Sequence, residues 1–527
     1  MEAKFNLLDE QWIKVRKGTN VEDVSLKDVF RRAHEYDALS GELPTQDAAI
    51  LRLLLAVLYA IFMRWDTKSN FSEIKTHDEA IARWRSLREL GRFPAEVTSG
   101  YLDEYRDRFW LFHPQKPFFQ VAGIRTSDDK ENPIAQIIAH VPSRTERRFF
   151  TELGGEVLQS LTFEEAARWL VHLQAWDYAG KKASVEGGRP NGGGTGWCGK
   201  LGVVYPVGGN LFETLMFNLA FADSVGQPIT FGSPVWEAEP KTAAGVDAVP
   251  QSYIELLTWQ SRRVRLFGDE HKVTGVLSSY GDVFAKENTF IEQMSGWHES
   301  SQKGQGYIPN THNASRSMWR DLGAILPQVS ADGKSQRPGV LDWLVLLEIN
   351  ENINICAVGY EYGAMMGVVN EMLCDSLTLN AKLLSELGKE WVPDIIKLVE
   401  YTEKAVNALG TLAADLDKAA GGDGVKSRES PKERAYFLLD EPFREWLRAI
   451  DPDSSDRFEI SEKWKNAAKQ IILKVGNELI AAAGPAAFIG RELTMNRKTY
   501  YMTSAVAETK FRGALRNIFG GGEKNEQ

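Results

Sequence analysis

The chain of 527 residues is 43% hydrophobic and 25% charged, which supports a large buried core and excludes a mainly disordered or disulfide-stapled protein. Its 62 Lys and Arg residues against 72 Asp and Glu give a net charge of −10. Proteins that bind nucleic acid through bulk charge are basic, so any contact with a polynucleotide must be local or shared with partner subunits.

The first 360 residues alternate between strand-like and helix-like patterns, which predicts a mixed α/β N-terminal domain over residues 1–362. Residues 5–15 and 21–26 are predicted as short strands. Residues 44–64 carry apolar side chains at three- and four-residue spacings, which predicts a core helix with Thr45 as its cap. Further expectations are helices over residues 78–90, 162–176 and 210–222, an irregular aromatic corner over 109–121, and strands or hairpins over 254–267 and 273–295.

A glycine-rich stretch interrupts this domain: eleven of the 45 glycines lie between Gly180 and Gly209. Such a density implies that the backbone turns sharply or approaches something closely. Residues 194–200 match the start of a phosphate-binding loop, but Leu201 stands where a hydroxyl would ligate magnesium. No helix is expected to follow either, so a nucleotide-binding enzyme that uses Gly194–Lys200 is a disfavoured alternative.

The glycine loop (residues 187–202) carries Arg189, Asn191 and Lys200 around three consecutive glycines. Backbone amides without neighbouring Cβ atoms can reach into a narrow groove or along phosphates. The pattern fits an unliganded surface loop equally well.

Two basic clusters stand out against the acidic total. Arg147 and Arg148 precede Phe149, with Arg144 nearby, and Arg262 and Arg263 are followed by Arg265 on an alternating segment. Basic residues beside aromatic ones suit polynucleotide backbones and bases. The alternative for either cluster is surface charge held in salt bridges. The eight histidines form no close pair and no nucleophile motif occurs, so no catalytic or metal site is predicted and the protein is expected not to be an enzyme.

Beyond residue 363 the pattern becomes uniformly helical, which predicts a C-terminal helical bundle over residues 363–527 and an α+β fold class overall. Helices are expected over residues 364–387, 392–419, 431–450 and 456–483, with a further one over 500–518.

The compartment follows from cysteine usage and from the apolar segments. Three cysteines (Cys198, Cys356 and Cys374) with no C-x-x-C pair argue against an oxidising compartment, a thiolate zinc site and a dithiol redox site. The most apolar stretch, residues 48–63, is shorter than the ~20 residues of a membrane span. We expect a cytoplasmic protein with no membrane partner and no cofactor.

Segments along the whole chain resemble the CasA family, the large subunit of the type I-E CRISPR surveillance complex, Cascade. The opening Phe5-Asn-Leu-Leu-Asp-Glu-Gln-Trp-Ile-Lys-Val15 is similar to the start of that family. In order, the other matching segments are residues 109–121, the glycine loop, Pro234-Val-Trp236, Lys286-Glu287 with Gly296-Trp297, and Gly359-Tyr360. The resemblance implies a mixed α/β N-terminal domain of unusual topology followed by a four-helix bundle.

The resemblance also implies a task. Members of that family recognise the protospacer-adjacent motif in double-stranded target DNA, largely through the minor groove, and promote strand separation and R-loop formation with the guide RNA of the complex. The minor groove carries a degenerate code, so several motifs would be tolerated, and base pairing reads the rest of the target. The family subunit recruits a helicase-nuclease for antiviral defence and is itself non-catalytic. A purely structural scaffold subunit is the alternative.

The family's motif-reading residues map onto two segments of this sequence. Its glycine loop aligns with Gly192, Gly193 and Gly194, beside Asn191. Its motif-reading lysine lies two residues after a Lys-Glu start, and here that position is Asn288, so either Asn288 reads the groove or Lys286 substitutes.

The family's strand wedge, a hairpin tip with a glutamine, maps to Gly363-Ala364-Met365, where Met365 can act as an apolar wedge instead. The loop near the 5′ end of the guide maps to residues 147–151, which include Arg147, Arg148 and Phe149. Contacts to nucleic-acid backbones are expected from these residues and from Arg262, Arg263 and Lys200.

Overall fold

The computed structural model describes residues 3–141, 158–284, 291–302, 306–326, 335–495 and 498–520. The chain forms two compact units. The N-terminal unit comprises Met1–Arg316, Ser330–Ile349 and Ile353–Ser376, and the C-terminal unit comprises Leu377–Gln527 with Ser317–Val329 and Asn350–Asn352. The mixture of helices and strands confirms the predicted α+β class. The main division falls between Ser376 and Leu377 rather than at residue 363.

The core of the N-terminal unit is α2 (Pro44–Phe62), in which every residue from Ala48 onward is buried. Pro44 opens the helix, where a missing N–H is harmless. The prediction that Thr45 caps this helix is wrong. Leu43 holds the cap position, and the Thr45 hydroxyl hydrogen-bonds the Tyr360 hydroxyl instead (2.8 Å). This helix is long and apolar enough to cross a membrane, but its side chains are enclosed by the unit, as in the core helix of a soluble protein.

Shorter helices pack around α2. Capping boxes at Thr76 and Thr162 begin two of them, which confirms the helices predicted near residues 78–90 and 162–176. Residues 254–267 begin with a helix instead of the predicted strand, because Ser252 accepts a hydrogen bond from the Glu255 amide. The helices are α1 (Leu26–Arg32), α3 (His77–Leu90), α4 (Ala95–Glu104), α5 (Phe163–Trp176), α6 (Leu211–Asn218), α7 (Tyr253–Leu257) and α8 (Gly339–Leu346).

The strands of this unit form several small sheets rather than one large sheet. Two-stranded sheets join β1 (Lys4–Asn6) with β5 (Trp110–Phe112) and β8 (Asp247–Ala248) with β11 (Val283–Phe284). Three-stranded sheets have the orders β3 (Asn20–Val24), β2 (Ile13–Lys17), β4 (Ala38–Leu39); β6 (Asn132–Pro133), β10 (Val273–Tyr280), β9 (Arg262–Gly268); and β13 (Tyr307–Pro309), β12 (Trp297–Glu299), β14 (Ser335–Gln336).

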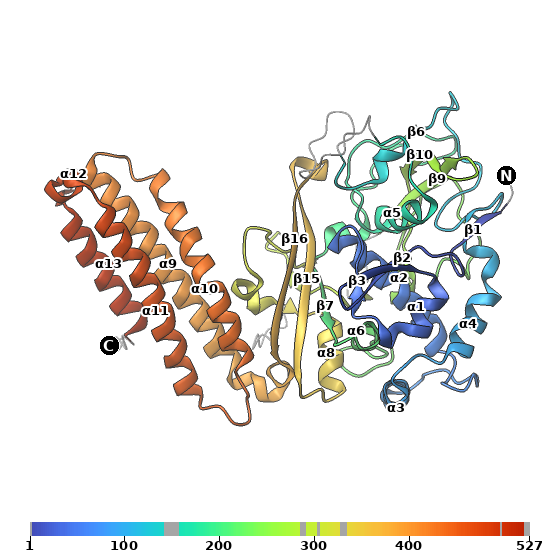
Figure 1. Cartoon of the computed structure of the whole chain (residues 1–527), viewed down its shortest axis with the longest axis horizontal. Helices are drawn as coiled ribbons and strands as arrows, with labels where there is room; N and C mark the ends of the chain where they lie inside the picture. Colours follow the sequence, from blue (N-terminus) through green and yellow to red (C-terminus); the bar gives the residue numbers. More distant parts are fainter. Residues whose placement is uncertain are drawn as a thin grey trace. The chain divides into compact units, whose positions relative to one another are not determined.

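A further sheet contains the two longest strands, β15 (Asn352–Tyr362) and β16 (Val369–Asn380), which lie side by side in Figure 1. The strand order is β16-β15-β7, with β7 at Val203–Val207. The helix predicted over residues 364–387 is therefore wrong. Val369, Leu373 and Leu377 are buried at a spacing of four, which resembles a helical stripe, but pairing with β15 satisfies the backbone as a strand.

The C-terminal unit contains four long helices, drawn side by side in orange and red in Figure 1. Within it, the Trp464 indole donates to the Thr402 hydroxyl (3.0 Å) and its ring packs edge-on against Phe443 (4.9 Å between centroids). The elements are α9 (Val392–Ala420), α10 (Glu429–Arg448), α11 (Arg457–Ala482), α12 (Pro485–Ile489), β17 (Arg491–Met495), β18 (Lys498–Met502) and α13 (Ser504–Phe519). The fourth long helix is thus α13, where the sequence predicted only an additional helix.

Candidate nucleic-acid interface

The predicted motif-reading glycines lie in the glycine loop, and two structural reasons account for them. Gly192 and Gly194 have φ of +84° and +62°, in the left-handed region that side chains disfavour. A Cβ at Gly192 would meet no described atom within 4 Å, whereas one at Gly193 would approach the Tyr280 ring to 2.6 Å. Gly192 therefore faces open space, and Gly193 is where the loop packs against the protein.

Arg262, predicted to contact a nucleic-acid backbone, instead holds the glycine loop in place. Its side chain is fully buried, and its Nη2 donates to the carbonyl oxygens of Gly194 (2.7 Å) and Tyr178 (3.0 Å). Its Nε donates to the Asp177 carboxylate (2.5 Å), which also pairs with Lys182 (2.7 Å). Burial raises the pKa of Asp177, but the charges of Lys182 and Arg262 outweigh it and lower that pKa overall.

Arg263 is also buried, so the prediction of a basic surface at this pair is wrong. Its Nη2 donates to the Asp282 carboxylate (2.5 Å) and to the Ala244 carbonyl (3.0 Å), and Lys241 supplies a second cation to Asp282 (3.1 Å). Buried cations need such partners, because an unpaired charge away from water is strongly unfavourable. Sequence patterning could not distinguish this arrangement from a charged surface.

The remaining polar side chains of the loop lie at its edge. Asn191 is exposed, and its carbonyl accepts a hydrogen bond from Arg189 Nε (3.0 Å). Arg189 in turn pairs with Asp247 (2.9 Å). A Cβ at Gly194 would lie 3.7 Å from the Lys200 ammonium, so this cation lies beside the backbone of the loop. Asn191 and Gly192 are thus exposed at the turn of the loop, and the Lys200 ammonium lies beside Gly194.

The predicted wedge residues form the tip of the β15–β16 hairpin (residues 363–368). Met365 is 94% exposed and Met366 is 44% exposed, and both adopt positive φ (54° and 55°). Two left-handed non-glycine residues in succession are unfavourable, and such strain concentrates at functional sites. The hairpin tip therefore presents a large apolar side chain outward from a tight turn.

The segment 176–179, called the anchor segment here, brings the glycine loop and the hairpin tip together. The Tyr362 hydroxyl donates to the Trp176 carbonyl (2.8 Å), and the Ala179 amide donates to the Met366 carbonyl (2.8 Å). From the loop side, the Gly196 amide donates to the Asp177 carbonyl (2.7 Å). Two segments far apart in sequence are thereby fixed next to each other. No motif in the sequence marked the anchor segment, which begins at the last residue of α5.

The phosphate-loop alternative lacks the geometry that it requires. The amides that would hold phosphate oxygens bond within the protein: Gly196 to Asp177, Trp197 to the Ser261 hydroxyl (3.2 Å), and Gly199 to the Gly196 carbonyl (3.0 Å). A four-residue 3₁₀ turn (Trp197–Lys200) and then β7 follow, instead of a helix.

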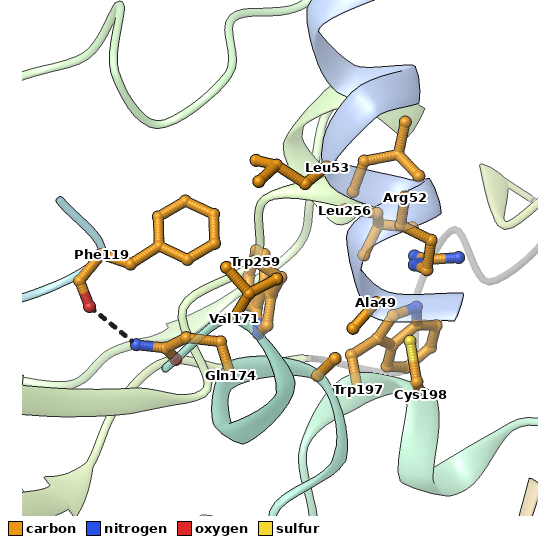
Figure 2. Close-up of a pocket in the computed structure, with 12 residues that line it drawn as sticks. Ala49, Arg52, Leu53, Phe119, Val171, Gln174, Trp197, Cys198, Leu256 and Trp259 are labelled. Carbon is orange, nitrogen blue, oxygen red and sulfur yellow. Dashed lines mark hydrogen bonds between the residues drawn. The ribbon is translucent and has the colours of Figure 1, made fainter. Parts of the chain in front are cut away.

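Beneath the loop lies a small cavity of about 20 Å³, the space of about one water molecule (Figure 2). Arg52 and Trp197 line it, and both bond the buried Glu292 carboxylate (2.8 Å each). Burial raises the pKa of Glu292, but the charge of Arg52 has the larger combined effect with its hydrogen bonds, and the net pKa is lowered. The Arg52–Glu292 pair therefore stays ionised. The cavity is too small for a nucleotide. Among the described residues, no group of three or more His, Cys, Asp or Glu side chains is placed to hold a metal ion.

Several predicted contact residues lie outside the described residues. These are Lys286, Asn288, Arg147, Arg148 and Phe149, together with Arg144 of the same basic cluster. Their roles remain predictions.

Known proteins of similar sequence and structure show to which class and to which family the chain belongs. A curated protein of Thermus thermophilus, "CRISPR-associated protein CasA/Cse1", is 27% identical over 503 residues, covering 89% of this chain and 91% of that protein. The crystal structure of Thermobifida fusca Cse1 has a TM-score of 0.83 and 33% identity, and each chain is covered to 98%. Cse1 from Acidimicrobium ferrooxidans follows with a TM-score of 0.80, 26% identity and 99% coverage of both chains.

These relatives are CRISPR-associated proteins, and the chain is of that class. The family model described as CRISPR-associated protein Cse1 matches residues 6–475. The chain therefore belongs to the CasA/Cse1 family, and the resemblance found in the sequence is confirmed.

Proposed function

We propose that this chain is the large subunit of a type I-E Cascade complex in the cytoplasm, and that it reads the protospacer-adjacent motif of double-stranded DNA with the glycine loop. Family membership supports the place in the complex. One observation of the structure carries the reading role: the glycine loop, through Gly196, and the hairpin tip, through Met366, are both hydrogen-bonded to the anchor segment. A groove-reading loop and a strand wedge must act on neighbouring base pairs, and this attachment provides that proximity.

The surface chemistry of the two segments suits the two parts of this task. Gly192 exposes backbone with space around it, and Asn191 and Lys200 add a hydrogen-bonding edge and a cation. Such a combination fits the narrow minor groove between two phosphate backbones. Met365 is an apolar side chain that can enter between base pairs and kink the duplex, as other minor-groove proteins do. Strand separation would then allow the guide RNA to pair.

The net charge of −10 is consistent with a subunit whose position on DNA is set by the rest of the complex. Only a local polar edge needs to face the duplex. The affinity of the isolated chain for DNA is therefore weak and falls steeply with salt.

Recruitment of the helicase-nuclease is the second part of the proposal and rests on the family alone. A complex bound to target DNA should retain the helicase-nuclease only when this chain is present. Equal retention by complexes with and without the chain would remove this part and leave motif reading unaffected.

The test of motif reading is Gly192→Asp in the assembled guide-RNA complex. Asp tolerates the left-handed conformation better than most residues, but it brings a negative side chain to the surface that faces phosphates. Gly123→Asp is the matched control, because Gly123 also has positive φ (72°) and open space around its Cβ. We expect target-duplex binding to fall about tenfold or more for Gly192→Asp only. Equal binding by both variants would favour the scaffold alternative.

A further inference from the structure

The β15–β16 hairpin carries two of the three cysteines in the chain. Cys356 lies on β15 opposite Tyr205 of β7, and Cys374 lies on β16. Cys356 is buried, Cys374 is exposed, and both are free thiols. Their spacing in the sequence gives no C-x-x-C motif, which is why the sequence predicted no dithiol site.

The two thiols lie on the same face of the hairpin. The Thr45 hydroxyl marks that face, because it contacts Tyr360 on β15 (2.8 Å, to the hydroxyl) and Met372 on β16 (4.0 Å, to Sδ). Side chains alternate between the two faces of a strand. Cys356 is four residues from Tyr360 and Cys374 is two residues from Met372, so both point to the Thr45 side. Each thiol is a main cause of the pKa shift of the other, so the two side chains lie within interaction range.

The surroundings make the two thiols chemically unequal. The hydrogen bond from Cys356 lowers the pKa of Cys374 to about 7, against the opposing effects of burial and of the carboxylates of Asp375 and Asp47. The same hydrogen bond, together with burial, raises the pKa of Cys356, although Tyr205 acts in the opposite sense. Cys374 is therefore the accessible nucleophile, since the thiolate is the reactive form, and Cys356 is the partner behind it.

Cys198 provides an internal comparison. It is 1% exposed, and burial raises the pKa of its thiol to about 11. Without an accessible thiolate, Cys198 is not expected to react with a disulfide from solution.

We propose that Cys374 and Cys356 are a reversible oxidation site, at which a low-molecular-weight disulfide converts the two thiols into a disulfide across the hairpin. The Cys374 thiolate attacks one sulfur of the small disulfide, forms a mixed disulfide and releases one small thiol. The Cys356 sulfur then attacks the Cys374 sulfur, loses its proton and releases the second small thiol. Two protein thiols are oxidised and one small disulfide is reduced to two thiols, so atoms and electrons balance.

The disulfide would join β15 and β16, the two strands that lead to the hairpin tip. On β16, Cys374 lies between the tip at Met365 and the end of the strand at Asn380. Cys356 and Cys374 lie on hydrogen-bonded neighbouring strands and point to the same face, an arrangement in which a disulfide can join two strands. A covalent cross-link restricts separation of the strands and fixes the stem of the hairpin. This inference concerns the thiols alone and does not depend on the proposed DNA-reading role.

The test uses the full-length reduced chain, oxidised glutathione at pH 7.5, and intact mass followed by peptide mapping. The wild-type chain should lose the mass of two hydrogens, with no retained adduct, and yield a peptide cross-link between Cys356 and Cys374. Cys356→Ser should retain one glutathione on Cys374, because the second attack is removed. Cys374→Ser should not react, and Cys198→Ser should behave as wild type.

Three results would overturn the proposal: a stable glutathione adduct on the wild-type chain, a cross-link that includes Cys198, or no reaction at Cys374. The wild-type mapping needs no substitution, so the proposal stays testable even if a serine variant fails to fold. Reduction by excess thiol should restore the original mass, which checks that the modification is reversible.

Discussion

Replacement of Arg262 by glutamine tests whether the glycine loop is positioned from inside the protein. Arg263→Gln is a close control. Both guanidinium groups are buried, each pairs with one aspartate at 2.5 Å, and each aspartate keeps a lysine partner after the substitution (Lys182 for Asp177, Lys241 for Asp282). Of the two, only Arg262 donates to the backbone of the glycine loop.

The expected magnitudes follow from these contacts. Removal of one partner of a buried ion pair lowers the free energy of unfolding by about 3–5 kcal/mol. We expect a loss near the lower value for both variants, because a lysine still pairs with each aspartate. The bond between Arg262 and the Gly194 carbonyl involves a charged donor, for which the net contribution is about 1.5–3 kcal/mol. Loss of that amount from the loop conformation corresponds to a roughly ten- to hundredfold decrease in target affinity.

The assay has two readouts. Urea unfolding of the isolated chain measures stability, and we expect similar losses for Arg262→Gln and Arg263→Gln. Binding of a target duplex by the assembled guide-RNA complex measures reading, and we expect the decrease only for Arg262→Gln. Equal binding by the two variants, whether both are weakened or both are unchanged, would refute the positioning role of Arg262.

Three further predictions use other parts of the molecule. Met365→Ala should slow R-loop formation about tenfold, which corresponds to a loss of about 1.4 kcal/mol of stabilisation by the wedge. Val225→Ala, which also shortens an exposed apolar side chain, is the control and should have no effect. Equal rates for the two variants would exclude the wedge. Burial raises the pKa of Asp47 to about 7, so its protonated form stabilises the fold at low pH and this contribution disappears as pH rises through 7. Between pH 5 and pH 8, the stability of Asp47→Asn relative to the wild-type chain should therefore rise by about 3 kcal/mol in urea unfolding, and parallel pH profiles of the two proteins would contradict this. Binding of duplex DNA by the isolated chain, measured by fluorescence anisotropy at two salt concentrations, should be weak and decrease with salt, whereas salt-independent binding would argue against a charged edge.

Local periodicity of apolar residues predicted the helices well where a helix buries either one face or its whole circumference. The apolar spacing of α2 and the long stripes of α9 and α11 are properties of the sequence itself. The same criterion failed at β16, where Val369, Leu373 and Leu377 are spaced as on a helix. The deciding interaction there is backbone pairing with β15, which no local window of sequence contains.

The candidate site was less predictable because its contacts are distant in sequence. Arg262 and Asp177 are 85 residues apart, so a run of arginines gave no sign that the first two are buried with carboxylate partners. Tyr362 and Trp176 are 186 residues apart, and their hydrogen bond is what brings the hairpin tip to the glycine loop. The sequence indicated both segments through a family resemblance, but their proximity required the fold.

Photo-crosslinking from the glycine loop to target DNA tests the central claim most directly. A benzophenone amino acid at Asn191, in a complex bound to a duplex with labelled motif nucleotides, should cross-link to the motif, because this side chain is exposed at the turn of the loop. The same group at Gly123, an exposed turn outside the loop, should give no DNA cross-link. If Asn191 cross-links only to protein while the complex remains bound to its target, the glycine loop does not read the motif.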